Sequence, residues 1–213
     1  MRGTFITFEG PEGSGKTTQI TRLCARLEGQ GRRVLRVREP GGTPTGEAIR
    51  GILQHDAAGE PICRETEALL FAASRAQLVQ RMILPALEQG DCVICDRFAD
   101  STTAYQGFGR GFPIEDMLAI NQFAIAGATP DLTLLLDIDP GSAAVRLQGR
   151  NQDTGSVPDR IEREDRAFHE RVRRGYLELA DREPERFVVL DGARDADALF
   201  ADVWAQVERV LHE

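Results

Sequence analysis

Short, almost wholly apolar segments alternate with longer amphipathic segments along this chain. Strand-like runs are expected at residues 4–9, 33–38, 91–95, 132–138 and 187–190. Apolar runs of this length, with few polar residues at alternate positions, are typical of strands buried on both faces of a parallel sheet. The pattern therefore predicts an α/β fold, with three layers in which helices flank a five-stranded parallel sheet.

Amphipathic segments that repeat at helical spacing lie between the predicted strands. In residues 17–30, for example, Ile20, Leu23 and Leu27 share one face. Further helices are expected at residues 45–54, 65–89, 114–126, 141–149, 160–182 and 196–212. Pro85 lies inside the long helix predicted at 65–89, and it lacks the N–H group that a helix interior requires. We therefore expect that helix to be disturbed there.

One polar, glycine-containing segment interrupts this alternation at residues 150–157, just before Pro158. Such a segment between regular elements favours a mobile loop, and we expect a lid over about residues 146–160. The sequence shows no internal repeat. With 213 residues, 41% of them hydrophobic, the chain is long enough for one domain spanning residues 1–213 with a sizeable core.

The charge balance limits the classes of partner. The formal net charge is −8 and the calculated pI is about 5.1, which argues against nucleic acid or an anionic membrane as the main partner. No run approaches the roughly 20 apolar residues of a membrane span. The first residues lead directly into a strand, so we expect no signal peptide and a cytoplasmic location. Cys92 and Cys95 have CxxC spacing, but without a second pair or a nearby His we interpret them as buried thiols of a strand.

Lysine occurs once in the chain, at Lys16, among 26 basic residues. A position that keeps lysine where arginine is used everywhere else indicates a site that needs a compact ammonium group. Lys16 belongs to the sequence GPEGSGKT, which matches G-x-x-x-x-G-K-[ST] and lies between a predicted strand and a predicted helix. Successive N–H groups of such a loop, together with the helix N-terminus, bind phosphate. The motif predicts an ATP-binding site formed by Gly10, Pro11, Glu12, Gly13, Ser14, Gly15, Lys16, Thr17 and the next residue, Thr18.

Asp96 and Arg97 follow the third apolar run directly. In P-loop proteins, a carboxylate at this place lies beside Mg²⁺ and the phosphates, so Thr17 and Asp96 are the candidate metal ligands. Arg97 offers a planar fork for phosphate oxygens. We expect Lys16, Asp96 and Arg97 to act in catalysis.

Phe71 and Arg75 are four residues apart on a predicted helix and share a face. An aromatic ring beside a bidentate donor can stack on a flat base and hydrogen-bond to its edge. From spacing alone, a place in the core explains Phe71 equally well.

Several short segments together resemble one family. They are REPGGT at residues 38–43, LFAASR at 70–75, DRF at 96–98, AYQG at 104–107 and Leu136-Asp137. With the GPEGSGKT loop, they occur in the order seen in thymidylate kinases, over nearly the whole chain. The resemblance implies a P-loop kinase fold and a transfer of the γ-phosphate of ATP to dTMP, with Mg²⁺ as cofactor.

The resemblance also implies a dTMP site. Phe71 resembles the residue that stacks on thymine, Arg75 the donor to the carbonyl edge of the base, and Tyr105 the tyrosine near the sugar 2′ position. The remaining candidates are Thr102 and Thr103 beside the base, Glu12 at the sugar 3′-OH, Arg50 and Arg97 at the phosphate, and Pro40 in the loop that shapes the pocket.

The P-loop contains no basic residue before Lys16, so the resemblance implies that the catalytic arginine comes from the lid. Arg150 is the first candidate and Arg160 the second, and Arg146 resembles the side chain that packs on adenine. Phe98 stands where Tyr or His is usual in the family.

Three other classes of protein compete with this interpretation. A kinase of another nucleoside monophosphate differs only in the roles of Phe71, Arg75 and Tyr105. A GTP-dependent switch requires an N-K-x-D segment, which a chain whose sole lysine is Lys16 cannot contain. A P-loop ATPase acting on nucleic acid conflicts with the acidic charge balance. The resemblance also implies a homodimer, for which the apolar helix at 114–126 offers surface.

Overall fold

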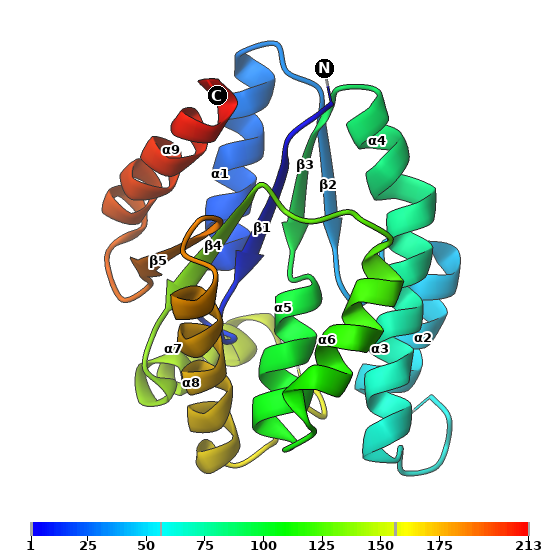
Figure 1. Ribbon diagram of the computed structural model, residues 1–213. Coiled ribbons are helices and arrows are strands. Elements are labelled where there is room, and N and C mark those ends of the chain that lie inside the picture. Colours follow the sequence, from blue (N-terminus) through cyan, green and yellow to red (C-terminus); the bar gives the residue numbers. More distant parts are fainter. Residues whose placement is uncertain (1, 56, 156, 213) are drawn as a thin grey trace.

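The computed structural model describes residues 2–55, 57–155 and 157–212, and its centre is a five-stranded parallel sheet (Figure 1). The strand order is β2-β3-β1-β4-β5. The strands are β1 Phe5–Glu9, β2 Val34–Arg38, β3 Cys92–Asp96, β4 Leu132–Asp137 and β5 Phe187–Asp191. The five-stranded parallel sheet expected from the apolar runs is confirmed.

Strand β1 lies between β3 and β4, and all five of its residues are buried. Ile6 pairs with Ile94 on one side and with Leu132 on the other. The chain thus runs from β1 toward β2 and β3 on one side of the sheet, then crosses to β4 and β5 on the other. In such sheets, ligands bind at the carboxyl ends of the strands where this reversal occurs, which places Glu9 and Asp96 beside a potential site.

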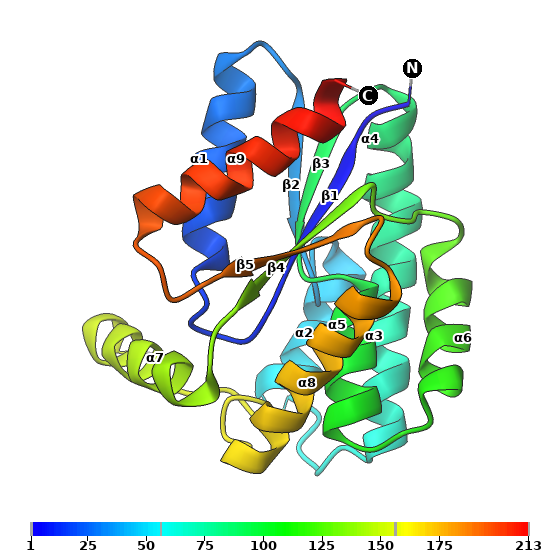
Figure 2. The same cartoon turned by 60° about the vertical axis from the view of Figure 1, so that its left-hand side comes forward.

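Helices cover both faces of the sheet (Figures 1 and 2). Their bounds are α1 Lys16–Gly29, α2 Pro44–His55, α3 Arg64–Leu78, α4 Leu84–Glu88, α5 Ala99–Thr102, α6 Ile114–Ile125, α7 Pro140–Thr154, α8 Arg166–Arg182 and α9 Ala196–His212, with π-helical segments η1 Val79–Ile83 and η2 Thr103–Gly109. No helix among the described residues is long and apolar enough to cross a membrane.

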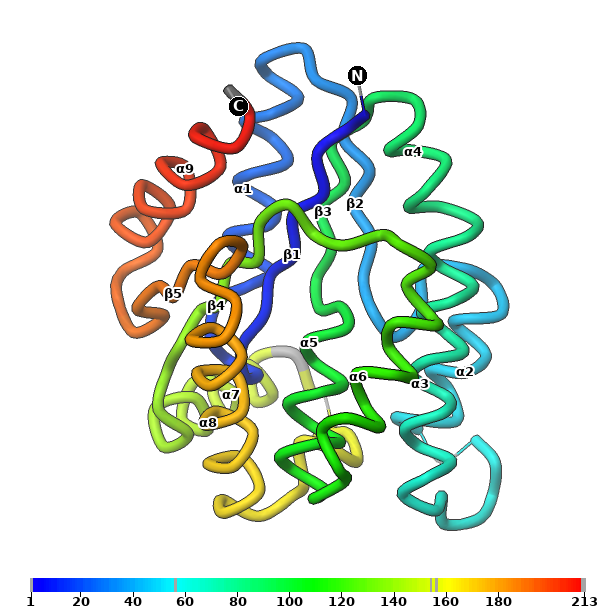
Figure 3. The backbone as a smooth tube through the Cα atoms, viewed as in Figure 1, coloured from blue at the N-terminus to red at the C-terminus, as the bar shows by residue number. Residues whose placement is uncertain are grey.

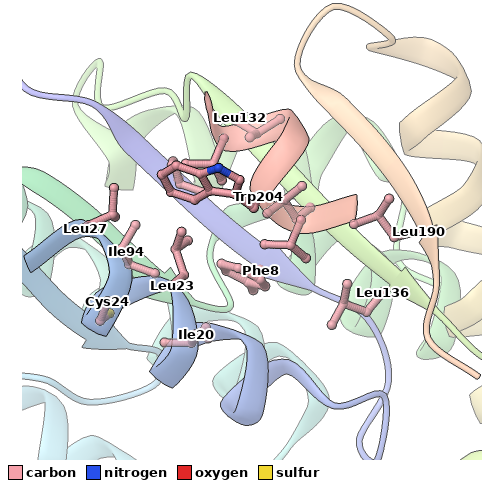
Figure 4. Close-up of a cluster of buried hydrophobic side chains, with 14 of the residues drawn as sticks. Phe8, Ile20, Leu23, Cys24, Leu27, Ile94, Leu132, Leu136, Leu190 and Trp204 are labelled. Carbon is pink, nitrogen blue, oxygen red and sulfur yellow. The ribbon is translucent and has the colours of Figure 1, made fainter. Parts of the chain in front are cut away.

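The alternating faces of the strands build two hydrophobic layers. Ile6 and Phe8 of β1 pack toward α1 and α9, where Leu23 and Trp204 are buried (Figure 4). Phe5 points to the opposite face, into a cluster with residues of α3, η1 and α4. A third cluster joins Tyr105, Phe168 and Tyr176 beside β4. This burial of apolar area on both faces is the main stabilising term of the fold.

The long helix predicted at 65–89 is disturbed at Pro85, as expected. It ends as α3 at Leu78, continues as the π-helical segment η1, and resumes as α4 at Leu84. Pro85 is the second residue of α4, and the π-helical turn lies directly before the position where its N–H is missing.

Two of the other predicted helices were wrong in extent. The helix predicted at 141–149 continues to Thr154, so the expected loop at 150–157 is helical over its first half; Ser156 lies outside the described residues. Asp139 caps the helix start by accepting from the Ser142 N–H, and Gly155, with φ of 67°, ends it. Figure 2 shows α7 projecting from the body of the molecule. The helix predicted from 160 begins only at Arg166, because Asp165 provides its N-cap.

Residues 99–109, for which no helix was expected, form α5 and η2 (Figure 3). Their Ser, Thr and Gly residues have low helix propensity. Packing overrides that preference, since the Tyr105 ring lies 6.1 Å from Phe168 and 6.2 Å from Tyr176 of α8, centroid to centroid.

Candidate active site

A cavity of about 470 Å³ opens at the carboxyl ends of β1, β2 and β3. The predicted site residues that line it are Glu12, Gly13, Gly15, Lys16, Thr17, Thr18, Pro40, Arg50, Phe71, Arg75, Asp96, Arg97, Thr102, Tyr105, Arg146 and Arg150. The cavity therefore brings together the motif predicted for ATP and the pocket predicted for the second substrate. Of the residues predicted to bind ATP or dTMP, four are not part of its lining: Gly10, Pro11, Ser14 and Thr103.

The loop between β1 and α1 depends on glycine. Gly10, Gly13 and Gly15 have φ of 127°, 77° and 95°, in the region that residues with a Cβ rarely adopt. At Gly10 a Cβ would also lie 2.4 Å from the carbonyl oxygen of Leu136. Gly10 thus shapes the loop without lining the cavity.

Lys16 is buried at the start of α1, and its ammonium group is held by the loop itself. Nζ donates to the carbonyl oxygens of Gly10, at 3.0 Å, and Pro11, at 2.9 Å. Burial, together with Arg97, lowers the pKa of the Lys16 ammonium, while Glu12 opposes that change. The compact charge expected at this position faces the cavity from the start of the helix.

Arg97 is fixed by contacts on several sides. Its Nη2 donates to Glu12 Oε1 at 2.7 Å, and its Nη1 donates to the Tyr176 hydroxyl at 3.2 Å. Its guanidinium carbon lies 5.2 Å from the centroid of the Tyr105 ring. Burial would raise the pKa of the Glu12 carboxyl, but Arg97 and Lys16 together lower it far below its usual value. Glu12 is consequently ionised at neutral pH.

Arg75 is almost completely buried, and most of its donors are occupied. Nε and Nη2 donate to Glu39 Oε2, Nη2 also to Thr102 Oγ1, and Nη1 to Asn121 Oδ1. The second N–H of Nη1 has no acceptor among the described residues and is the donor that Arg75 can offer to a ligand. Phe71 is half-buried on the same helix and lines the cavity, so Phe71 is not purely a core residue.

The two threonines predicted beside the base differ. Thr102 lines the cavity and accepts from Arg75. Thr103 instead accepts from Asn121 Nδ2 at 3.0 Å and is fully buried behind the cavity wall. Thr103 therefore supports Asn121, which in turn orients Arg75.

The lid arginines occupy different places. Arg150, on α7, lines the cavity, and its Nη2 donates to Glu162 at 2.9 Å while its Nη1 lies 3.8 Å from Glu12 Oε2. Arg146 lines the cavity too, and donates to the carbonyl oxygens of Gly192 and Ala193.

Arg160 is not part of the cavity lining. It pairs with Glu67 on α3 at 2.5 Å and donates to the carbonyl oxygen of Leu53. Of the two catalytic candidates, only Arg150 faces the cavity.

Thr17 and Asp96 present oxygen atoms on the lining of the same cavity. Mg²⁺ prefers oxygen ligands and is commonly held by one or two protein groups together with substrate phosphates. No group of three or more His, Cys, Asp or Glu side chains able to hold a metal exists within the described ranges. The donor set thus fits a magnesium ion that arrives with a nucleotide.

Sequence reasoning missed two buried carboxylates. Glu39 pairs with Arg75, and burial raises its pKa to about 7 against the opposing effect of Arg75. Glu9, the last residue of β1, accepts from Ser101 and Tyr176 and from the Phe98 N–H. Glu9 ends an apolar strand, where a buried acidic residue was itself a signal, because burying a charge is costly unless it is bonded. Glu39 follows β2, which contains two arginines, and had no such signal.

The comparisons with known proteins agree with this geometry. The family model described as "Thymidylate kinase" matches residues 8–203. The chain belongs to the thymidylate kinase family. Curated thymidylate kinases from Deinococcus radiodurans and Pelotomaculum thermopropionicum are each 50% identical to it, over 99% of this chain and 99% and 95% of their own lengths. The crystal structure of thymidylate kinase from Ehrlichia chaffeensis matches with a TM-score of 0.77 and 33% identity, covering 98% of this chain and 99% of that one.

Membership of the thymidylate kinase family makes the chain an enzyme, a kinase that binds nucleotides. The GTP-switch and nucleic-acid ATPase interpretations are thereby excluded. The P-loop kinase fold expected from the resemblance is confirmed.

Proposed function

We propose that the cavity performs the reaction of the family, transfer of the γ-phosphate of ATP to dTMP, with the residue roles that the sequence predicts. One observation supports this most directly. The P-loop, with Lys16 and Thr17, and the pocket with Phe71 and Arg75 line one continuous cavity, and Arg97, which pairs with Glu12 of the P-loop, lines it as well. The two nucleotides would meet with their phosphates at Arg97.

The ATP side consists of the loop at residues 10–15 and the start of α1. Backbone N–H groups and the helix N-terminus bind the phosphates, and Lys16 adds a mobile positive charge. Arg146, which donates to the carbonyl oxygens of Gly192 and Ala193, would pack on adenine. Thr17 and Asp96 would hold Mg²⁺, which when bound neutralises phosphate charge.

The dTMP side is formed by α3, α5, η2 and the loop after β2. Phe71 would stack on the base, and Arg75, fixed by Glu39 and Asn121, would donate its remaining N–H to a carbonyl of the base. Arg50, whose Nη1 donates to the carbonyl oxygen of Pro40 at 3.0 Å, would share the acceptor phosphate with Arg97.

Transfer between two phosphates asks the protein to align two anions, neutralise their charge and exclude water. Lys16, Arg97 and Arg150 would provide that positive field around the transferred group. An acceptor phosphate is ionised near neutral pH, so no strong general base is needed. Closure of the lid at residues 146–160 over the cavity would protect ATP from hydrolysis.

We also propose a homodimer and a cytoplasmic location. Helix α6 leaves Phe123 86% exposed and Leu118 43% exposed, and the neighbouring α3 leaves Leu69 58% exposed. Large apolar side chains gathered on two packed helices favour a protein contact. All four cysteines are free thiols, which suits a reducing compartment. Phe123→Glu should convert a dimer to a monomer in sedimentation experiments.

The proposal is tested by coupled ADP release from ATP and Mg²⁺ with dTMP, dUMP, dCMP, UMP and GMP in parallel. We expect the highest kcat/KM with dTMP and almost no release without an acceptor. A higher kcat/KM with another nucleotide would preserve the transfer and overturn the roles of Phe71, Arg75 and Tyr105. Release that does not depend on any acceptor would overturn the transfer itself.

A further inference from the structure

Glu9 is a fully buried carboxylate at the end of β1, one residue before the P-loop, and it is not part of the cavity lining. Its Oε1 accepts from the backbone N–H of Phe98 at 2.7 Å. Its Oε2 accepts from the Ser101 hydroxyl at 2.6 Å and from the Tyr176 hydroxyl at 2.9 Å. All three donors surround Arg97: one is the next residue, and two are side chains that contact its guanidinium.

The backbone of Arg97 needs this support. Its φ is 68°, in the left-handed region, which costs a residue with a Cβ about 1 kcal/mol or more unless its surroundings hold it there. The two peptide N–H groups on either side of its Cα are both bonded to the end of β1. Arg97 N donates to the carbonyl oxygen of Phe8 at 2.9 Å, and Phe98 N donates to Glu9 Oε1.

The guanidinium is oriented by the same carboxylate through two hydroxyl groups. Arg97 Nη1 lies 3.2 Å from the Tyr176 oxygen and 3.4 Å from the Ser101 oxygen. A guanidinium only donates, so both hydroxyls must present lone pairs to it. They can do so because each directs its proton to Glu9 Oε2, which as a carboxylate oxygen only accepts.

We propose that Glu9 is a positioning residue for Arg97, holding both its backbone and its guanidinium in the geometry that the acceptor phosphate requires. This inference rests on the proposed function, in which Arg97 binds the phosphate of dTMP. Glu9 touches neither substrate pocket and acts only through Phe98, Ser101 and Tyr176. It also connects three segments distant in sequence: β1, the turn after β3, and helix α8.

An amide of the same shape cannot replace this carboxylate. If the Glu9→Gln side chain directs its NH₂ at the two hydroxyls, their protons must turn toward the donors of Arg97. If it directs its oxygen at the hydroxyls, the NH₂ faces the Phe98 N–H. Either orientation leaves donors facing each other, and a buried unmatched donor is costly. The substitution should therefore disturb Arg97 while conserving side-chain volume.

The test is a double-mutant cycle with Glu9→Gln, Arg97→Ala and the two combined, assayed at pH 8 with dTMP and ATP varied separately. We expect Glu9→Gln to lower kcat/KM for dTMP by roughly tenfold or more, as displacement of a phosphate-binding group does, with KM for ATP unchanged. In the Arg97→Ala background, Glu9→Gln should lower kcat/KM for dTMP by less than about threefold, since the side chain that Glu9 positions is gone.

Asp131→Asn is the matched control. Asp131 also accepts from a backbone N–H of β1, that of Phe5, at 2.7 Å, but at the opposite end of the strand. It should leave the kinetics with both substrates unchanged. Tyr176→Phe is a second probe that keeps Glu9 in place. It removes one hydroxyl between Glu9 and Arg97 and should also lower kcat/KM for dTMP selectively.

Three results would overturn the inference. The first is an equal fold-decrease of kcat/KM for dTMP on Glu9→Gln with and without Arg97. The second is a rise in KM for ATP as large as the loss in kcat/KM for dTMP, and the third is wild-type kinetics in both Glu9→Gln and Tyr176→Phe. If Arg97→Ala alone leaves the kinetics with dTMP unchanged, it is the proposed role of Arg97 that fails. If the wild-type protein shows no release that depends on dTMP, the proposed function fails.

Discussion

Glu12 Oε1 and Arg97 Nη2 lie 2.7 Å apart, so a carboxylate of the P-loop is paired with the arginine that we assign to the acceptor phosphate. The two residues are 85 positions apart in the chain and meet because β1 and β3 are adjacent strands. The pair keeps two oppositely charged side chains in place at the point where two anionic substrates would meet.

Glu12→Gln should reduce discrimination between dTMP and its 3′-deoxy analogue. An ionised Glu12 is expected to accept from the sugar 3′-OH, and a hydrogen bond to a charged group contributes about 1.5–3 kcal/mol. The ratio of kcat/KM for the two acceptors should fall by roughly tenfold. Steady-state rates with both nucleotides measure it, and an unchanged ratio would remove Glu12 from the sugar site.

Arg150→Ala should lower kcat about a hundredfold or more, as loss of a catalytic arginine does in phosphoryl transfer. Arg160→Ala is the matched comparison, because its guanidinium is turned away from the cavity toward Glu67. Its kcat should stay within about threefold of wild type, with a lower melting temperature because the buried Glu67 keeps its ion pair with Arg110 but loses the one with Arg160. The reverse order of the two kcat values would assign the catalytic role to Arg160.

Phe71→Ala should raise KM for dTMP about tenfold and leave KM for ATP unchanged. The ring lines the cavity, and stacking on an aromatic side chain contributes roughly 1–3 kcal/mol per base. Phe112→Ala is the control, since Phe112 is partly buried but lies outside the lining. If KM for ATP rises equally, then Phe71 has a structural role only.

Glu9→Gln should also change how stability depends on pH. Burial and Asp100 raise the pKa of the Glu9 carboxyl from 4.5 to about 7, against the effects of Ser101 and Arg97. Between pH 4.5 and about pH 7, Glu9 of the folded protein holds a proton that the unfolded chain has largely released. The stabilisation from this proton is fully present below about pH 4.5 and is lost as the pH rises through 7.

Denaturant unfolding of wild type and Glu9→Gln at about pH 5 and about pH 8 measures this effect. From the lower to the higher pH, wild type should lose roughly 2–3 kcal/mol of unfolding free energy relative to the variant. The raised pKa of Glu39 cancels in the comparison, because both proteins contain it. Equal losses in the two proteins would place the pKa of Glu9 near its ordinary value.

The strands and the P-loop could be predicted because each depends on a local pattern. The run from Phe5 to Glu9 is apolar enough to require burial, and the glycines of the loop permit the positive φ that this turn adopts. Residues 99–109 could not be predicted as helical, since their packing on α8 overrides weak propensity. Helix α7 was underestimated because polar residues are compatible with both a loop and an exposed helix.

Within the site, residues that would touch a substrate were easier to predict than those that hold them. Phe71 and Arg75 follow from helical spacing and family motifs. Glu9, Glu39 and Asn121 act on Arg97 or Arg75 from elements brought together only by folding, so no spacing in the sequence relates them. Among these, only Glu9 carried a signal, as an acidic residue in a strand that the apolar pattern predicts to be buried.

Lys16 carries the sole side-chain amine of this chain, and that amine is enclosed by the carbonyl oxygens of Gly10 and Pro11 at the ATP site. Amine-selective reagents would therefore modify a single side chain, at the place where the triphosphate is expected to bind. The extent of labelling on the peptide that contains Lys16, separated from the α-amine of the N-terminus, would report nucleotide occupancy without an engineered probe. Any natural acylation of a lysine side chain in this protein would likewise fall on the P-loop.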